Sequence, residues 1–283
     1  NPSVNAFLRV DADEALARAR QLDAWQAAGH PLGPFHGVPM AHKDMFYRKG
    51  IVSTCGSEIR RSFIAPVTST LLSRLDQAGA VDLGTLNMTE FAFGPTGHNA
   101  VWGDCCNPWD AAHITGGSSS GSGAAIAAGL VPASLGSDSG GSVRLPAGIC
   151  GVVGIKPTLG RLSLHGAMGL SYSIDTAGPL ARSVRDCARM LRVLAGFDSA
   201  DGRTSMRPVP DYEAESQRGV KGLRIGVPTT HFYEEATAEV QQVMEHALDG
   251  LVELGARLIE VPTPNCKYMM ELSRAILYPE AAA

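Results

Sequence analysis

Residues 116–144 read GGSSSGSGAAIAAGLVPASLGSDSGGSVR, two Gly/Ser turns separated by an alanine-rich segment of helical length. Every glycine costs conformational entropy on folding, so chains gather small residues where their backbone must come very close to something. A ligand, a reacting atom or a neighbouring element would each require such an approach. This stretch therefore predicts either a functional site or an unusually close packing contact.

Alternating strand and helix patterns surround this stretch. Upstream of it, the spacing of apolar residues predicts helices over 11–28 and 69–78 and strands over 37–44 and 80–84. Downstream, the same criteria predict a strand over 151–155, a helix over 182–195, and a strand–helix–strand unit over 223–227, 236–254 and 257–261. That last order implies parallel strands. We therefore predict an α/β fold, with a mixed, largely parallel central sheet and helices on both faces.

The ends of the chain suggest that it is part of a longer protein. The sequence begins at Asn1 rather than at a start methionine, and it stops at Ala283 in a helix-forming segment with no glycine after it to cap a helix. We expect a single domain over residues 1–283 that is incomplete at both ends.

Composition excludes several classes of function. With 45% hydrophobic and 18% charged residues, the chain is typical of a globular protein, and its net charge of -4 with scattered positive residues argues against direct binding of nucleic acid. No apolar run is long enough to span a membrane and no signal peptide is visible, so we expect a cytoplasmic protein. The six cysteines lack disulfide or metal-ligand spacing, and we predict reduced thiols and neither a metal nor a cofactor.

Three interpretations of the Gly/Ser stretch use only part of it. A phosphate-binding loop needs a lysine after its glycines, and no lysine lies between Lys49 and Lys156. Residues 117–121 match the G-x-S-x-G nucleophile elbow of α/β-hydrolases, with Ser119 as nucleophile, but this leaves the second turn unexplained. A helix rich in glycine and alanine could also simply pack closely against its neighbours.

A fourth interpretation uses both turns. In Ser139-Gly140-Gly141-Ser142, two glycines allow successive backbone N–H groups to point at one spot, directly before a hydroxyl. Acyl transfer needs such an arrangement, because a nucleophile must lie beside donors that stabilise the developing oxyanion. The second turn therefore predicts Ser142 as a nucleophile and Ser139, Gly140 and Gly141 as its oxyanion or substrate-binding residues.

A serine nucleophile needs a base, and Lys43 is the candidate that the sequence favours. It is the lysine that ends an apolar strand, where α/β folds place their chemistry. To accept a proton near neutral pH, its pKa must fall by roughly 3 units from about 10.4, which burial can achieve. Strand alternation turns the side chains of His42 and Asp44 away from Lys43.

Three separated motifs, taken in order, resemble those of the amidase signature family. HGVPMAHKD at 36–44 resembles its lysine motif, GGSSSGSGAAIAAG at 116–129 its glycine–serine motif, and LGSDSGGSVRLPAGICGVVGIKPTLGRLS at 135–163 its nucleophile motif with the following strand. NPWD at 107–110 and SIDTAGPLARSV at 173–184 are also similar. The resemblance extends from about Asn5 to Ala283, with a signature core of about 37–200.

The resemblance implies a Ser–Ser–Lys triad. Ser142 would be the nucleophile, Ser118 a bridging serine that follows a cis peptide bond, and Lys43 the base. The backbone N–H groups of residues 139–142 would form the oxyanion hole, and no metal or cofactor would take part. Family members are usually much longer than this chain, and the C-terminal part that completes their substrate pocket is not in the sequence.

The predicted function is hydrolysis of a linear carboxamide C–N bond through a serine acyl-enzyme. The expected partner is a small-molecule amide, with no nucleic acid and no membrane, and a homodimer is left open. One alternative is the A subunit of a glutamyl-tRNA(Gln) amidotransferase, which supplies a partner protein with ammonia released from glutamine. Another is a non-catalytic binding relative. Nearby, we expect Arg144 to pair with Asp138 rather than with a substrate carboxylate.

Overall fold

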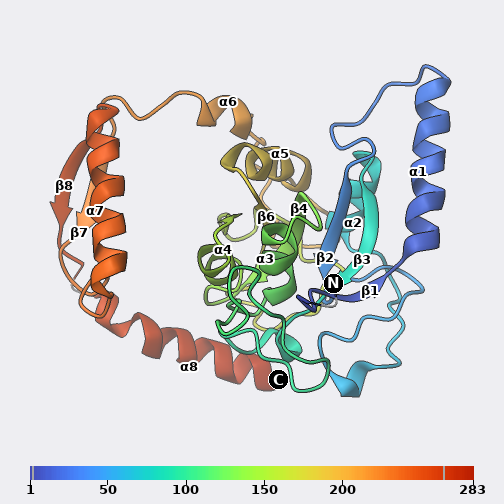
Figure 1. The fold of residues 1–283 in the computed structure, drawn as a ribbon, viewed down its shortest axis with the longest axis horizontal. Helices are drawn as coiled ribbons and strands as arrows, with labels where there is room; N and C mark the ends of the chain where they lie inside the picture. Colours follow the sequence, from blue (N-terminus) through green and yellow to red (C-terminus); the bar gives the residue numbers. More distant parts are fainter. Residues whose placement is uncertain (2, 264) are drawn as a thin grey trace. The chain divides into compact units, whose positions relative to one another are not determined.

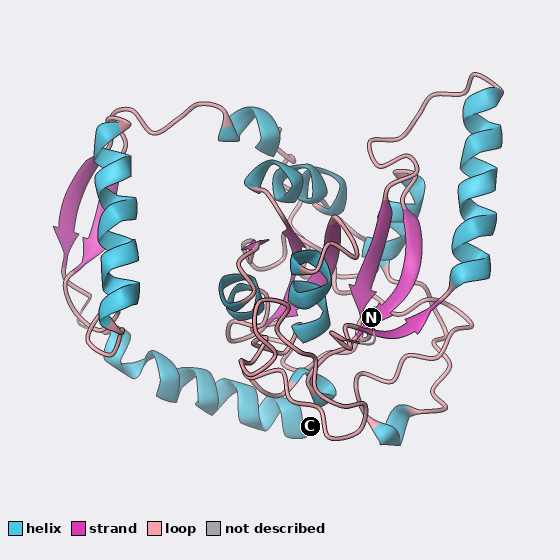
Figure 2. Cartoon of the chain, in the orientation of Figure 1, coloured by secondary structure: helices cyan, strands magenta, loops and turns pink. Residues whose placement is uncertain are grey.

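The computed structural model describes residues 1, 3–263 and 265–283, which form two compact units. The first unit is Asn1–Glu213 and the second is Ala214–Ala283. Each unit has a β-sheet of its own (Figures 1 and 2). That the whole chain forms a single domain stays a prediction.

The sheet of the first unit is mixed. Its strand order is β1 (Phe7–Val10), β3 (Val81–Leu86), β2 (Pro39–Lys43), β4 (Ala133–Asp138), β6 (Thr176–Ala181) and β5 (Val153–Gly154). Strands β3, β2, β4 and β5 run in one direction, and β1 and β6 run in the other. The prediction of a mixed, largely parallel sheet is confirmed.

Helices cover both faces of this sheet, as the sequence predicts (Figure 1). The helices of the first unit are α1 (Ala12–Ala27), α2 (Thr70–Gln77), α3 (Ser120–Ala127), α4 (Arg144–Ile149) and α5 (Val184–Leu194), with α6 (Tyr212–Ser216) at the unit boundary. On one face, α2 and α5 pack in a core with Leu135 and Ala177 of the sheet. On the other face, α3 packs with Ala41, Leu86 and Leu180.

Helix α3 owes its close packing to glycine, so the packing interpretation of the Gly/Ser stretch is correct for part of it. A Cβ on Gly121 would collide with the backbone of Ala6 and Asn87, and one on Gly123 would lie 2.9 Å from the Pro146 carbonyl oxygen. A larger side chain at either position would push the helix away from β3 or α4. Glycine there lets the N-terminus of α3 lie deep in the unit.

The sequence did not predict three strands, β1, β4 and β6, or two short helices, α4 and α6. Only the C-terminal end of α8 was expected to be helical, and the predicted strand over 151–155 shortens to β5. Strand β6 contains Gly178-Pro179, which reads as a turn signal. The reason for glycine is instead tertiary, because a Cβ on Gly178 would collide with the Ile155 carbonyl.

The chain between β3 and α3 is mostly irregular, as predicted for 85–110 (Figure 2). Its one short helical turn is η2 (Glu90–Ala92), and a similar turn, η1 (Glu58–Arg60), lies earlier in the chain. Phe91 and Ala92 have φ angles of 50° and 60°, which side-chain-bearing residues adopt at a cost. Such backbone often borders a functional site.

The second unit is built on the predicted strand–helix–strand segment. Strands β7 (Arg224–Pro228) and β8 (Arg257–Val261) pair in parallel, joined by α7 (Ala238–Glu253), and the unit continues through η3 (Cys266–Tyr268) to α8 (Met269–Ala282). Every residue of β8 is exposed. Across the described residues of both units, no helix is long and apolar enough to cross a membrane.

Candidate active site

Lys43 is the last residue of β2 and is fully buried, with 0% of its surface exposed. Its Nζ donates hydrogen bonds to Ser118 Oγ at 2.6 Å and to Ser137 Oγ at 2.8 Å. The structure thus brings together two of the predicted catalytic residues that are far apart in sequence. Ser137, from the end of β4, is a partner that the sequence analysis missed.

Burial lowers the pKa of Lys43 to about 7. The nearby carboxylates of Asp175 and Asp138 and the Cys55 thiol raise it, but by less than burial lowers it. An ammonium loses its hydration in such a site, so the neutral amine is favoured. At neutral pH a large fraction of Lys43 is therefore an unprotonated amine that can accept a proton, as a general base must.

Ser118 lies just before α3 and is completely buried. The Gly117–Ser118 peptide bond is cis, as the family resemblance implies. The carbonyl of Ser118 accepts a hydrogen bond from the Thr89 amide at 3.1 Å, which ties this turn to the irregular segment after β3. Ser118 does not cap the helix, because Ser119 occupies the N-cap position. Its hydroxyl is instead directed to Lys43.

Ser142 lies in the turn before α4 and is half-buried. Its carbonyl accepts a hydrogen bond from the Ser119 amide at 3.3 Å, so the two Gly/Ser turns are in direct contact. Within the part of the chain that the structure describes, the Ser142 hydroxyl has no hydrogen-bond partner. The structure places Ser142 beside the Ser118–Ser119 segment without a hydrogen bond between the hydroxyls of Ser118 and Ser142.

The backbone amides predicted for the oxyanion hole fall into two groups. The Gly141 amide donates to Asp138 Oδ1 at 2.8 Å and is therefore already engaged, unlike the prediction. Among the described residues, the amides of Ser139, Gly140 and Ser142 meet no acceptor. Gly141 has a φ of 133°, a conformation that favours glycine. Its contribution is to shape the turn rather than to offer a donor.

Asp138 organises this turn from within. Its carboxylate is fully buried and accepts from the Gly141 amide, from the Val143 amide at 3.1 Å and from Arg144 Nε at 3.0 Å and Nη2 at 2.9 Å. Burial alone would raise the pKa of Asp138, but these hydrogen bonds and the Arg144 charge lower it below its usual value. The predicted Arg144–Asp138 pair is confirmed.

Two further serines have structural partners. Ser139 donates its hydroxyl to Asp175, which also accepts the amides of Leu170 at 2.7 Å and Ser171 at 2.9 Å. Ser119 is fully buried, and its hydroxyl lies 3.3 Å from both the amide and the carbonyl of Ser137. A hydroxyl held this way by backbone is poorly placed to attack a substrate, so the α/β-hydrolase interpretation finds no support.

Comparison with known proteins agrees with this geometry. The family model described as Amidase matches residues 1–283, and the chain belongs to this family, that of the amidase signature enzymes.

Relatives and solved structures with different roles resemble the chain. It is 48% identical over 265 residues to the A subunit of the glutamyl-tRNA(Gln) amidotransferase of Anaeromyxobacter sp. (strain K), covering 94% of this chain and 54% of that protein. The native peptide amidase of Stenotrophomonas maltophilia is 36% identical with a TM-score of 0.92, covering 99% of this chain and 59% of that one.

A third similar structure is described by the words "An unexpected vestigial protein complex reveals the evolutionary origins of an s-triazine catabolic enzyme". It is 40% identical with a TM-score of 0.94, covering 99% of this chain and 61% of that one. The chain therefore spans little more than half the length of the proteins that it matches.

Proposed function

We propose that this chain carries the catalytic serines and lysine of an amidohydrolase that cleaves a linear carboxamide through a serine acyl-enzyme. Ser142 is the nucleophile, Ser118 the bridging serine and Lys43 the base. The observation that carries the proposal is the 2.6 Å contact between the buried Lys43 amine and the Ser118 hydroxyl, at a lysine whose pKa is lowered to about 7.

The proposed acylation step moves one proton through two hydroxyls. Ser142 Oγ attacks the amide carbon as its proton passes to Ser118 Oγ, and the proton of Ser118 passes to Lys43 Nζ. The C–O bond forms, and the carbonyl electrons become an oxyanion facing the amides of Ser139, Gly140 and Ser142. Collapse breaks the C–N bond, and the leaving nitrogen takes the proton from Lys43 through Ser118.

Water then completes the cycle. It gives a proton to Lys43 through Ser118 as it attacks the acyl carbon. The ester bond to Ser142 then breaks, Ser142 Oγ takes that proton back from Lys43 through Ser118, and the product leaves as a carboxylic acid that ionises to the carboxylate. The hydroxyls of Ser118 and Ser142 must come within hydrogen-bond distance for this transfer. Catalytic hydrogen bonds often tighten only when substrate is bound. The backbone hydrogen bond from Ser119 to Ser142 supports this proton transfer, because it keeps the two Gly/Ser turns together.

The test is active-site labelling combined with an activity panel. Wild-type protein should react with a fluorophosphonate probe at Ser142, and Ser142→Ala should lose both labelling and hydrolysis of every member of a panel of aliphatic, aryl, urea-type and glutaminyl amides. Ser119→Ala is the matched control and should still be labelled. Full labelling of Ser142→Ala would end the proposal, and labelling lost only in Ser119→Ala would favour the hydrolase elbow.

A second candidate is the A subunit of a glutamyl-tRNA(Gln) amidotransferase. The similarity to proteins of that description, at 48% identity in one case, supports it. It predicts that glutamine is the preferred amide of the panel and that its hydrolysis depends on a second protein.

If the chain is instead a non-catalytic binding relative, the probe should not label it at all. A homodimer and a cytoplasmic location stay predictions.

A further inference from the structure

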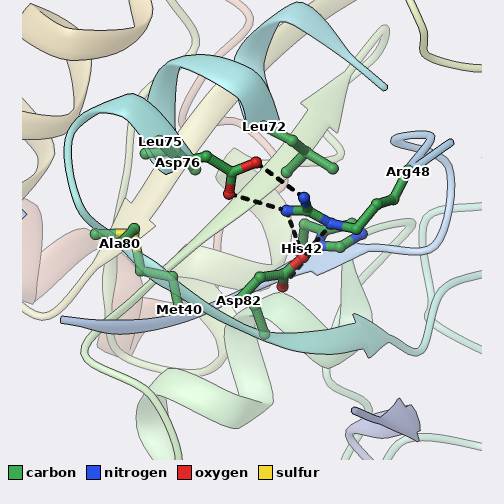
Figure 3. A pocket seen from close by; sticks show the side chains of 9 residues that line it. Met40, His42, Arg48, Leu72, Leu75, Asp76, Ala80 and Asp82 are labelled. Atoms are coloured by element: carbon green, nitrogen blue, oxygen red, sulfur yellow. Dashed lines mark hydrogen bonds and ion pairs between the residues drawn. The ribbon is translucent and has the colours of Figure 1, made fainter. Parts of the chain in front are cut away.

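Strand β2 presents different chemistry to the two faces of the sheet. Lys43 and Ala41 face α3, while Met40 and His42 face α2, because side chains alternate along a strand. On the α2 side, His42 borders a cavity of about 10 Å³ with Leu72 among its lining residues (Figure 3). His42 is only 1% exposed, so a polar ring is buried one residue before Lys43, on the opposite face of the sheet.

A chain of charged groups ends at this ring. His42 Nδ1 lies 3.1 Å from Asp82 Oδ1, Arg48 Nε donates to Asp82 Oδ2 at 2.8 Å, and Arg48 Nη1 donates to Asp76 Oδ2 at 2.9 Å (Figure 3). A carboxylate only accepts hydrogen bonds, so Nδ1 of His42 carries the proton in this contact. Asp82 is thereby held between a ring on β2 and a guanidinium on the loop after it.

Asp82 also marks an irregularity in the pairing of β2 with β3. Met40 pairs with Asp82, but His42 pairs with Thr85, so β3 has one more residue than β2 over this interval. Asp82 Oδ1 accepts a hydrogen bond from the Gly84 amide at 3.2 Å, within this bulge of β3. Bulges of this kind bend the strand that contains them and redirect the side chains that follow in it, here Thr85 and Leu86 of β3, and Leu86 pairs with Lys43.

The other nitrogen of the His42 ring has no such role. Nε2 is buried and meets no hydrogen-bond partner among the described residues. Its surroundings include the apolar side chains of Met40, Leu72 and Leu75. An unsatisfied buried polar atom costs stability, so an apolar residue of similar size would fit this position as well or better. His42 is therefore hard to explain by stability alone.

We propose that His42 is a positioning residue, whose hydrogen bond to Asp82 fixes the β3 bulge and so holds Lys43 Nζ between Ser118 and Ser137. The inference rests on the proposed function, in which Lys43 is the base. In this role His42 acts on Lys43 only through β2 and the β3 bulge, without contacting a substrate.

The expected signature is a change in the titration of Lys43. Charged and titratable groups from several elements lie around the two residues. Asp138, Asp175 and Cys55 act on Lys43, and Asp82 and Arg48 lie beside His42. If β2 loses its anchor, the amine gains hydration and its pKa rises from about 7 toward the ordinary value for lysine. Less neutral amine is then present at any pH below that value.

The test follows the rate at which a fluorophosphonate labels Ser142 as a function of pH, together with the melting temperature. His42→Leu should keep or raise the melting temperature, yet move the midpoint of the labelling profile up by about one pH unit, which makes labelling about tenfold slower below the midpoint. His42→Asn, which can offer an N–H near the Nδ1 position, should retain the wild-type midpoint.

Asp198→Asn is the control for a purely structural effect. Asp198 accepts hydrogen bonds from Thr70 and Ser163, both at 2.6 Å, and among the described residues none of its hydrogen-bond partners lies on β2 or β3. This variant should lower the melting temperature without moving the midpoint. If His42→Leu does not fold, Asp82→Asn must produce the same upward shift.

Two results would overturn the inference in distinguishable ways. In the first, His42→Leu keeps the wild-type midpoint while the separate variant Lys43→Met loses labelling. This result refutes the role of His42 and leaves the proposed function intact. A wild-type labelling rate and midpoint in Lys43→Met refutes Lys43 as the base, and the inference then falls with it.

Discussion

The two compact units differ in what they bury. In the first unit, Lys43, Ser118 and Asp138 are all completely buried, although each carries a polar or charged group. In the second unit, Ala256 alone is buried among the described residues, while apolar side chains such as Val243 on α7 and Leu258 on β8 are exposed. One unit hides polar groups and the other displays apolar ones.

The comparison shows that local sequence patterns are enough to predict secondary structure, whereas the chemistry of the candidate site depends on burial. The strand–helix–strand order of the second unit follows from local periodicity. The buried polar groups of the first unit lower stability unless they are paired, and burial lowers the pKa of one of them, Lys43, to about 7. The contrast can be tested by substitutions in each unit.

The largest effect is expected for Lys43→Met. Removing the base should lower kcat/KM for the best amide of the panel by about 1,000-fold, within the range for loss of general acid–base catalysis. Lys49→Met, at an exposed lysine six residues later, is the control and should retain activity. A Lys43→Met enzyme with the wild-type pH profile would show that the base is another residue.

The same substitution should stabilise the fold, most strongly in acid. Below pH 7 Lys43 is protonated in both states, so the folded protein bears the full cost of a buried ammonium. As pH rises from 7 toward about 10.4, only the unfolded chain keeps that proton and the cost disappears. Lys43→Met should therefore raise the free energy of unfolding by up to about 4 kcal/mol at pH 6.

Urea denaturation at pH 6 and at pH 10 measures this difference. The gain should be nearly absent at pH 10. A gain of equal size at both pH values would mean that lost hydration of the charge is not its cause.

Asp138→Asn tests a buried charge that is well paired. We expect a loss of about 2 kcal/mol in the free energy of unfolding at pH 7, because an amide cannot replace a carboxylate that accepts from Gly141, Val143 and Arg144. The pKa of Asp138 is lowered in the folded protein, so its contribution is present above about pH 3.9 and is lost as pH falls through the folded value.

The corresponding measurement is thermal or urea unfolding of wild type and Asp138→Asn between pH 3 and pH 7. The gap between the two proteins should narrow at the acid end. Asp110→Asn, at an exposed aspartate, should unfold like wild type throughout. A gap that stayed constant with pH would indicate that shape rather than charge matters at Asp138.

The smallest effect belongs to the second unit. Val243 is 65% exposed, so Val243→Ser should change the free energy of unfolding by no more than about 0.5 kcal/mol. Leu72→Ala in the first unit, at a side chain only 2% exposed, should cost about 3 kcal/mol in the same urea titration. Equal costs at the two positions would break the comparison between the units.

Much of the fold was predictable because its signals are local. Helices α1, α2, α5 and α7 and strands β2, β3, β7 and β8 follow from apolar periodicity and stop signals. Strand β6 was not predictable in this way, because its Gly178-Pro179 suggests a turn unless the neighbouring backbone of Ile155 is already in place. Gly178 is required by a close contact with Ile155, more than twenty residues earlier in the chain.

The candidate site divides along the same line. The sequence by itself determined Lys43, Ser118 and Ser142 as candidates, because the residue types that acyl transfer needs recur in recognisable motifs. Only the tertiary structure decided that Ser137 shares the lysine and that Asp138 takes the Gly141 amide. The contact between His42 and Asp82 was likewise decided only by the tertiary structure. Hydrogen bonds and lost hydration depend on distances between segments far apart in the chain, and no local pattern encodes those distances.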